Sequence, residues 1–237
     1  MPVNFDAIDE IIDCGSGGSI SNLTSMSLSW WQYVRSNGEG NLGRVFEKRS
    51  ATAQVKVIFH TSVIAQSLNW EHATDGTTLD VDMAAGTLTF NVWQHIIMTW
   101  DGSLIATNVH FYLNGTETSY LTQQNGTGTL ALDDTGSWYI GNRPVGDRTS
   151  DAIYSEFAVW NVVLSNSEIS QLSQSKVKGI PYQIRPSNLV AYWPLDDFSD
   201  NQVASGTGSV RDRSSNANHG TPSNSPNCRA EQVLSYP

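Results

Sequence analysis

Paired carboxylates are the first residues in this sequence that could do chemistry. Glycoside hydrolysis needs two carboxyl groups, about 5 Å apart when the configuration is retained. The aspartate pairs at 133–134 and 196–197 are consecutive, so on a strand their side chains point to opposite faces. Asp80 and Asp82 share one face, about 7 Å apart, without a third carboxylate or a base beside them in the sequence. We therefore interpret them as a solvated strand face and predict no enzyme.

Nucleophilic and zinc chemistry are not supported by residue spacing. The chain has no Gly-x-Ser-x-Gly, His-x-His or Cys-x-x-Cys pattern, and its five histidines are scattered. Cys14 and Cys228 lie in terminal segments without a neighbouring histidine. They could form a disulfide, but the absence of a secretory leader favours two free thiols.

Charge excludes two classes of partner. The formal net charge is −10, with 13 Lys and Arg residues against 23 Asp and Glu. Nucleic acids and anionic membranes need a basic surface, and the sequence has none. No apolar run approaches the ~20 residues of a membrane-spanning helix, so we expect no membrane insertion. The first residues, MPVNFDAIDE, lack the features of a signal peptide, which favours synthesis in a cytoplasm over secretion.

The chain reads as strands separated by turns. Segments such as MSLSWWQYV (26–34) alternate in the period of two typical of β-structure, and Gly, Asn and Asp divide them. Residues 108–121 predict a hairpin around Asn114-Gly115, a pair that tolerates positive φ at both central positions of a type I′ turn. A length of 237 residues suits one sandwich domain.

One short helix is expected near 166–176. Ser165 and Glu168 form a capping box before an amphipathic segment, and Gly179 with Pro181 ends it. Ile169 and Leu172 would then face the sheet. All other segments predict an all-β fold.

The ordered segments resemble the laminin-G-like branch of the concanavalin-A-like jelly rolls. VNFDAIDEIIDCGSG is similar to the family's F-D-G-x-D-D-x-V pattern. WQHIIMTWDG with VHFYLNG is similar to its central hairpin, and WYIGNRP with IYSEFAVWNVVLSNSEISQL to its last strand and the helix after it. LVAYWPLDD is similar to its first strand, and VRDRSSNANHG to its Asp-x-Ser-x-Asn-x-Asn-His-Gly loop. The resemblance implies a two-sheet antiparallel jelly-roll sandwich. Ala7 and Ser215 depart from it, because the pattern has glycine at both.

The order of the matching segments is circularly permuted relative to the family. We predict a single domain, 1–237, in which 186–221 supplies the displaced first strands and 222–237 forms a C-terminal tail. The termini of a sandwich are commonly close together, which makes such a permutation physically reasonable. Alternatives are a truncated second repeat beginning at 186, and pairing of the displaced strands with a neighbouring subunit.

Calcium is the one metal that the resemblance suggests. Many relatives hold it near loops with oxygen ligands, and Asx-type side chains are hard ligands of that kind. The candidate ligands are Asp196, Asp197, Asp212, Asn216 and Asn218. The alternative is an Asx-turn loop whose side chains bind their own backbone. No cofactor is required by this reading.

Carbohydrate binding needs exposed aromatic rings on a face or rim of the sandwich. The candidates are Trp31, Trp70, Tyr120, Trp138 and Tyr154. We interpret another set as core because it sits within apolar strands: Trp30, Trp93, Trp100, Trp160 and Trp193.

The expected function is a non-catalytic structural or attachment module. The permuted, leaderless order resembles phage and environmental viral proteins, which implies a virion surface location as capsid decoration or fibre-associated protein. Its partners would be capsid or fibre subunits, further copies of itself, and cell-surface glycans. The alternative is a free or secreted lectin. A glycoside hydrolase or lyase is disfavoured, because the Glu-x-Asp-x-x-Glu strand of family-16-type β-glucanases is missing.

Overall fold

Two antiparallel sheets of eight strands each build the molecule, as seen in a computed structural model that describes residues 1–49, 54–59, 66–174 and 180–229. We call them sheet A and sheet B. In spatial order sheet A contains β10 (Thr116–Glu117), β9 (Val109–Leu113), β8 (Trp93–Trp100), β3 (Met26–Val34), β13 (Asp151–Trp160), β1 (Val3–Asp6) and β16 (Asn227–Cys228), with β14 (Leu189–Trp193) also paired to β13.

Sheet B faces sheet A across the core. Its order is β11 (Tyr120–Gln124), β7 (Leu79–Met83), β6 (Leu68–His72), β5 (Gln54–Phe59), β4 (Arg44–Arg49), β12 (Ser137–Ile140), β2 (Ile11–Asp13) and β15 (Thr221–Ser223). The described residues also contain four short 3₁₀ turns between these elements: η1 (Gly18–Ile20), η2 (Glu39–Asn41), η3 (Ala106–Asn108) and η4 (Ile180–Gln183). The predicted jelly-roll sandwich is confirmed.

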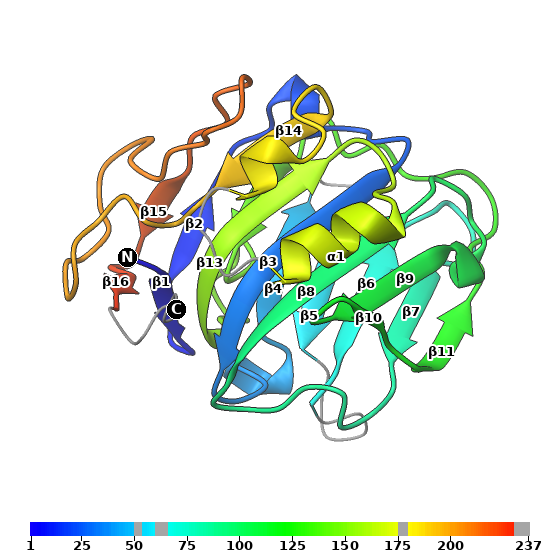
Figure 1. Cartoon of the computed structure of the whole chain (residues 1–237), viewed down its shortest axis with the longest axis horizontal. Helices are drawn as coiled ribbons and strands as arrows, with labels where there is room; N and C mark the ends of the chain where they lie inside the picture. The colour runs from blue at the N-terminus through cyan, green and yellow to red at the C-terminus, as the bar shows by residue number, and fades with distance from the viewer. Residues whose placement is uncertain (50–53, 60–65, 175–179, 230–237) are drawn as a thin grey trace.

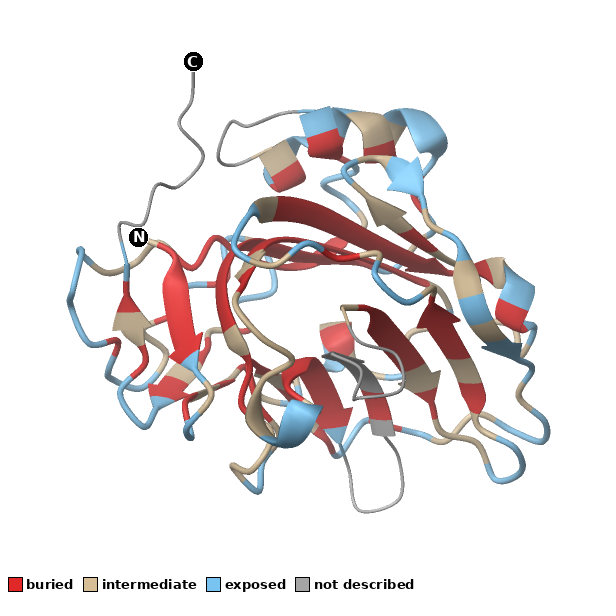
Figure 2. Ribbon diagram, turned by 90° about the horizontal axis from the view of Figure 1, so that it is seen from below, coloured by how far each residue is buried: buried red, intermediate tan, exposed pale blue. Residues whose placement is uncertain are grey.

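The helix covers the outer face of sheet A. α1 (Asn166–Gln174) lies in front of the sheet in Figure 1 and above it in Figure 2. Ile169 and Leu172 are buried, and they pack with Ile97 and Trp160 of the sheet. The predicted helix and its apolar face are confirmed over the residues that the structure describes. Within those residues no helix is long and apolar enough to cross a membrane.

Aromatic side chains fill the space between the sheets. Phe46 stacks on Trp138 with ring centroids 4.7 Å apart, and Phe157 lies 6.2 Å from Trp193. Fully burying such a side chain contributes about 1.5–3 kcal/mol. Four of the five tryptophans expected in the core are fully buried, and the exception is Trp93, which is half-buried against Tyr33.

The C-terminal segment is part of the sheets of its own chain. β14 pairs with residues 157–160 of β13, and β1 pairs with residues 151–154 of the same strand edge. Both run antiparallel to β13, so 189–193 and 3–6 lie end to end along it (Figure 1). The predicted circular permutation makes 189–193 the family's first strand and 3–6 the strand after it, and an end-to-end placement is what that order requires.

Two details of the C-terminal prediction are wrong. Residues 186–221 were expected to supply several displaced strands, but between β14 and β15 they form only isolated bridges, such as that of Val210 to Gly220. Residues 221–223 and 227–228 are strands that pair with β2 and β1, so 222–229 is not a tail. Strand edges leave backbone N–H and C=O groups unpaired, and these short strands satisfy them. The rest of the predicted tail, 230–237, lies outside the described residues.

The two cysteines are unpaired. Cys14 and Cys228 are both free and buried. Burial raises the pKa of both thiols, Cys228 to about 11, which keeps them protonated and unreactive.

Candidate functional site

Four of the five aromatic residues predicted to bind sugars are buried, so this prediction is wrong for them. Trp70, Trp138 and Tyr154 are at most 1% exposed. Trp31 is 8% exposed, on the outer face of sheet A, where the ring of His95 covers it at 4.9 Å. Trp70, Trp138 and Tyr154 belong to the core between the sheets, and at Trp31 the outer face of sheet A is covered as well. None of the four rings offers a face to a ligand.

Tyr120 is the exception, and it leads to a pocket. Its hydroxyl donates to Glu117 Oε1 at 3.0 Å and accepts the backbone N–H of Phe111 at 2.9 Å. Tyr120 therefore caps the free edge of β9 and orients Glu117. Burial is the main cause that raises the pKa of Tyr120, followed by the charge and hydrogen bond of Glu117.

The β9–β10 hairpin forms one wall of that pocket. Its turn is the predicted Asn114-Gly115, with φ of 50° and 84°. Asn114 is held to β8, because its N–H donates to His95 O at 2.8 Å and its Oδ1 accepts the His95 N–H at 2.9 Å. A Cβ on Gly115 would lie 3.0 Å from Ser173 Cβ of α1. Glycine thus permits both the left-handed turn and the approach of the helix.

The second wall is the first turns of α1. The capping box is present, because Ser165 N–H donates to Glu168 Oε2 at 2.8 Å and Glu168 N–H to Ser165 Oγ at 3.4 Å. Below the helix, His95 bonds Ser173 through Nδ1 and Ser29 through Nε2, both at 2.9 Å. These contacts fix the helix against the hairpin.

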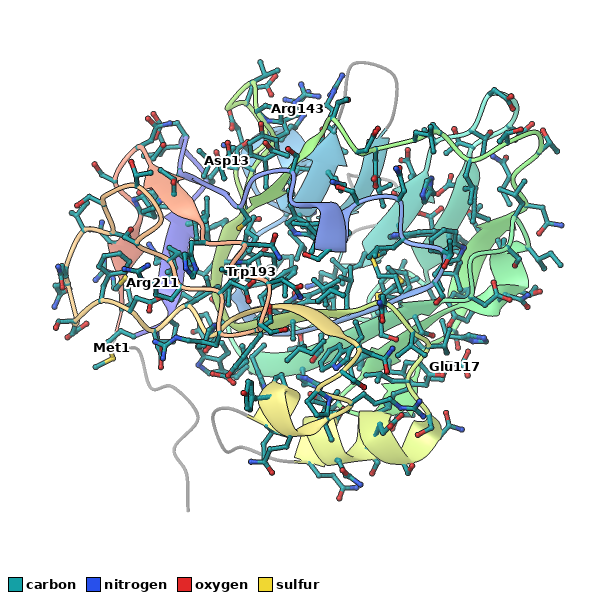
Figure 3. All side chains as sticks on the ribbon, turned by 90° about the horizontal axis from the view of Figure 1, so that it is seen from above. Met1, Asp13, Glu117, Arg143, Trp193 and Arg211 are labelled. Carbon is teal, nitrogen blue, oxygen red and sulfur yellow. The ribbon has the colours of Figure 1, made fainter. Side chains whose placement is uncertain are left out.

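The hairpin and the helix enclose a cavity of about 600 Å³, which we call the hairpin–helix pocket. Its lining residues are His110, Tyr112, Gly115, Thr116, Glu117, Asn166 and Ile169. This volume is within the ~300–1,000 Å³ typical of small-molecule sites. Figure 3 shows Glu117 on the side of the molecule that carries α1.

The pocket combines aromatic rings with one carboxylate. His110 Nδ1 lies 2.7 Å from Glu117 Oε1, and the His110 and Tyr112 ring centroids are 6.4 Å apart. Burial and the nearby Glu117 charge raise the pKa of Tyr112, so its hydroxyl stays protonated. Oε1 of Glu117 faces both His110 Nδ1 and the Tyr120 hydroxyl, which leaves Oε2 to accept from a ligand. Rings for apolar faces, with a carboxylate for hydroxyls, suit a polyhydroxylated ligand.

A signal for this site was present in the sequence. In VHFYL, His110 and Tyr112 alternate with Val109 and Phe111, which are buried on the other face. The predicted hairpin therefore implied two outward rings on one strand. Glu117 lies on the other strand of the same hairpin, directly opposite Tyr112, so the hairpin register brings it to the pocket. Asn166 had no comparable signal, because packing of the helix beside the hairpin brings it in.

The predicted calcium ligands divide into two groups that do not meet at one site. Asp212 is 5% exposed, and its Oδ1 accepts N–H bonds from Tyr192 and Ser214, both at 2.8 Å. Its Oδ2 accepts the Asn218 N–H at 2.8 Å. Asn216 Nδ2 donates to Val190 O at 3.1 Å. The loop thus matches the Asx-turn alternative.

The other two candidates bind an arginine. Asp197 and Asp196 lie 3.0 Å and 3.7 Å from Arg213 Nη2. Among the described residues no group of three or more His, Cys, Asp or Glu side chains could hold a metal ion. Calcium binding through the five residues as one set is not supported by this geometry, and calcium binding itself stays a prediction.

Sheet B carries an acidic outer face that the sequence analysis underestimated. Strand register places Glu71 directly opposite Asp80, and Glu47 two strands further along the same row. Asp80 and Asp82 both accept from Asn69 Nδ2. The expectation that Asp80 and Asp82 lack a third carboxylate is therefore wrong, because sheet pairing brings residues distant in sequence side by side.

These carboxylates are engaged in contacts within the protein. Glu47 is fully buried and pairs with Arg44 Nε at 2.7 Å and Arg49 Nη1 at 3.3 Å. Burial of Arg44 lowers its pKa, while the Glu47 charge opposes that change. The geometry is that of a structural charge network.

A double antiparallel sandwich with polar pockets outside its core defines the class of concanavalin-A-like β-sandwich proteins. A family model of the concanavalin A-like lectin/glucanases superfamily, Laminin_G_3, matches residues 12–170, and the chain belongs to this family. The match ends before β14, so the circular permutation stays a prediction. No curated protein matches the sequence.

Solved structures share the fold at low identity. A protein from Bacteroides ovatus described as a "putative carbohydrate binding protein" aligns with a TM-score of 0.57 and 15% identity, over 96% of this chain and 61% of that one. A heptameric SAP-like pentraxin from Limulus polyphemus aligns at 0.48 with 14% identity, over 76% and 83% of the two chains. The binding domain of Paraclostridial Mosquitocidal Protein 1 aligns at 0.48 with 15% identity, over 65% and 37%. The chain thus spans less than two thirds of the Bacteroides protein's length.

Proposed function

We propose that this chain is a non-catalytic carbohydrate-binding module and that the hairpin–helix pocket is its binding site. The observation that carries the proposal is the convergence of His110, Tyr112 and Glu117 in an open pocket of about 600 Å³. A pyranose presents an apolar face to an aromatic ring while its edge hydroxyls donate to a carboxylate. The family and the description of the Bacteroides relative support the same class.

The residues at this pocket argue against hydrolysis. Both glycosidase mechanisms need two carboxyl groups flanking the bond, and Glu117 is the one carboxylate among the described lining residues. The acidic row on sheet B is occupied by Arg44, Arg49 and Asn69. We therefore propose binding without turnover.

A glycan array probed with the full chain is the first test. We expect binding to a set of glycans and no release of reducing ends from them. Glu117→Gln removes the charge at nearly constant shape and should weaken binding about tenfold, since a hydrogen bond to a charged group contributes about 1.5–3 kcal/mol. Tyr112→Ala should abolish detectable binding.

Tyr182→Ala is the matched control. Tyr182 is 57% exposed on η4 and does not line the pocket, so its loss should leave both binding and melting temperature unchanged. A chain that binds no glycan on the array would overturn the proposed function. Binding that persists in Tyr112→Ala would show that the glycan site lies outside the hairpin–helix pocket.

Attachment to a virion or another assembly is a further proposal, which rests on the sequence resemblance alone. Mass spectrometry of purified particles tests it, because a decoration protein is recovered with the capsid in fixed stoichiometry. Its absence from particles would leave the free or secreted lectin.

A further inference from the structure

A second cavity lies where four separate segments of the chain meet, beside β14. We call it the loop pocket, and its volume is about 460 Å³. It is lined by residues from 18–24, Asn161, residues from 186–190, Ser215 and Asn216. It shares no lining residue with the hairpin–helix pocket.

The lining is uncharged and mainly polar. No Asp, Glu, Lys, Arg or His, and no aromatic side chain, occurs among the described residues that line it. An anion would find no cation there, and a cation would find no carboxylate. The complementary ligand is therefore neutral and rich in hydrogen-bonding groups.

Three asparagines are each fixed to the protein through one end of the amide. Asn22 Oδ1 accepts the Asp133 N–H at 2.8 Å, and Asn161 Oδ1 accepts from Asn188 Nδ2 at 2.9 Å. Asn216 Nδ2 donates to Val190 O at 3.1 Å. Within the described part of the chain, the opposite ends of these amides form no hydrogen bond. Two donors and one acceptor thus stay available on side chains that are already oriented.

The wall behind these asparagines is rigid. Asn218 Nδ2 donates to Ser19 Oγ at 3.0 Å, and the Asn218 N–H donates to buried Asp212 at 2.8 Å. A Cβ on Gly17 would lie 2.0 Å from Asn218 Oδ1, so glycine permits the two loops to touch. Pre-oriented groups lose less conformational entropy when a ligand binds.

We propose that the loop pocket is a second saccharide site, selective for uncharged sugars bound through their hydroxyl edges. This inference rests on the proposed function and extends it, because one chain would then hold two glycan residues with different chemistry. Hydroxyls of a sugar both donate and accept, which matches Asn22 and Asn161 as donors and Asn216 as acceptor. The absence of an aromatic ring in the described lining excludes face stacking.

Amide chemical shifts measure the two sites separately. The probes are methyl β-D-glucopyranoside, methyl β-D-galactopyranoside and N-acetylglucosamine, titrated into the ¹⁵N-labelled full chain. We expect saturable shifts at 18–24, 187–190 and 215–216 with at least one probe, and we expect them to persist in Glu117→Gln. Ser187→Trp places a bulky side chain at an exposed lining position and should weaken them about tenfold or more.

The double variant Thr24→Ala/Ser215→Ala is a second test without added bulk, since both residues are exposed and line the pocket. It should weaken the same shifts and keep the spectrum otherwise unchanged. Shifts confined to 110–117 would overturn this inference and leave the proposed function standing. No shift at the loop pocket with any probe overturns it as well, whereas the glycan array decides the proposed function.

Discussion

The hairpin–helix pocket and the loop pocket offer a ligand opposite chemistry. The first brings the rings of His110 and Tyr112 together with the Glu117 carboxylate, whereas the described lining of the second has amides, hydroxyls and aliphatic side chains but no ring and no charge. The first is built from residues 110–169, whereas the second needs residues 18–24, 161, 186–190 and 215–216. The comparison shows that one sandwich can place a locally encoded site and a site assembled from distant loops on the same molecule.

The largest expected effect is that of deleting the C-terminal segment, which contributes to the loop pocket but not to the hairpin–helix pocket. Deleting everything after Pro186 removes β14, including fully buried Trp193, and one wall of the loop pocket. Loss of a buried tryptophan alone costs about 3–5 kcal/mol, which is a large fraction of a domain's stability. We expect the 1–186 fragment to show no cooperative melting by circular dichroism.

The full chain, melted under the same conditions, is the reference. If 1–186 were soluble, melted cooperatively and still bound glycan at the hairpin–helix pocket, β14 would be an appendage.

The second-largest expected effect is that of Asp212→Ala, which should disrupt the loop pocket and leave the hairpin–helix pocket intact. Asp212 organises the 212–218 loop through at least three backbone N–H groups. Donors left unsatisfied in a buried site cost about 1–3 kcal/mol each, so we expect a loss of about 3 kcal/mol in the free energy of unfolding. Shifts at the loop pocket should disappear while those at 110–117 remain.

Chemical denaturation measures that loss, and Asp134→Ala is its control because Asp134 is exposed. Equal stability of Asp212→Ala and the parent chain would contradict the assigned role of the loop.

The helix side of the molecule should respond to pH. Burial lowers the pKa of His95 to about 3, from an ordinary 6.5. The unfolded chain therefore takes up a proton first as the pH falls below 6.5, and stability is lost progressively toward pH 3. Between pH 7 and pH 5 this costs about 2 kcal/mol, a loss that His95→Gln should not show.

Glu10 acts in the opposite direction and makes the variant comparison necessary. Burial raises the pKa of Glu10 to about 7, so its contribution to stability falls as the pH rises from 4.5 through 7. Subtracting the free energy of unfolding of His95→Gln from that of the parent chain at each pH cancels the contribution of Glu10. A difference that does not change with pH would contradict the buried neutral His95.

The smallest effect concerns the helix cap. Ser165→Ala removes one partner of the capping box and should destabilise by about 1 kcal/mol. Glycan affinity at the hairpin–helix pocket should fall slightly, because α1 carries Asn166 and Ile169. Ser170→Ala, inside the same helix, is the control. A drop in loop-pocket shifts with Ser165→Ala would show that the two sites are coupled.

Local signals predicted the elements well. Asn114-Gly115 and the Ser165–Glu168 box each act within a few residues, so the hairpin and the helix start could be predicted. The sugar candidates failed for a different reason. Trp31 stands on the outer face of β3 as alternation allows, yet His95 and the helix region cover that face. Alternation cannot tell which faces a distant element will cover.

By itself, the sequence determined the all-β class, the family, the hairpin, the helix and its apolar face, because these depend on spacing and on short-range backbone preferences. Only the tertiary structure decided which tryptophans are buried, that Asp212 serves its own loop, and that Asn166 of α1 lines a pocket with the hairpin. It alone brings residues 18–24 beside 215–216. Those outcomes depend on sheet register and on the packing of segments far apart in the chain, which no local pattern encodes.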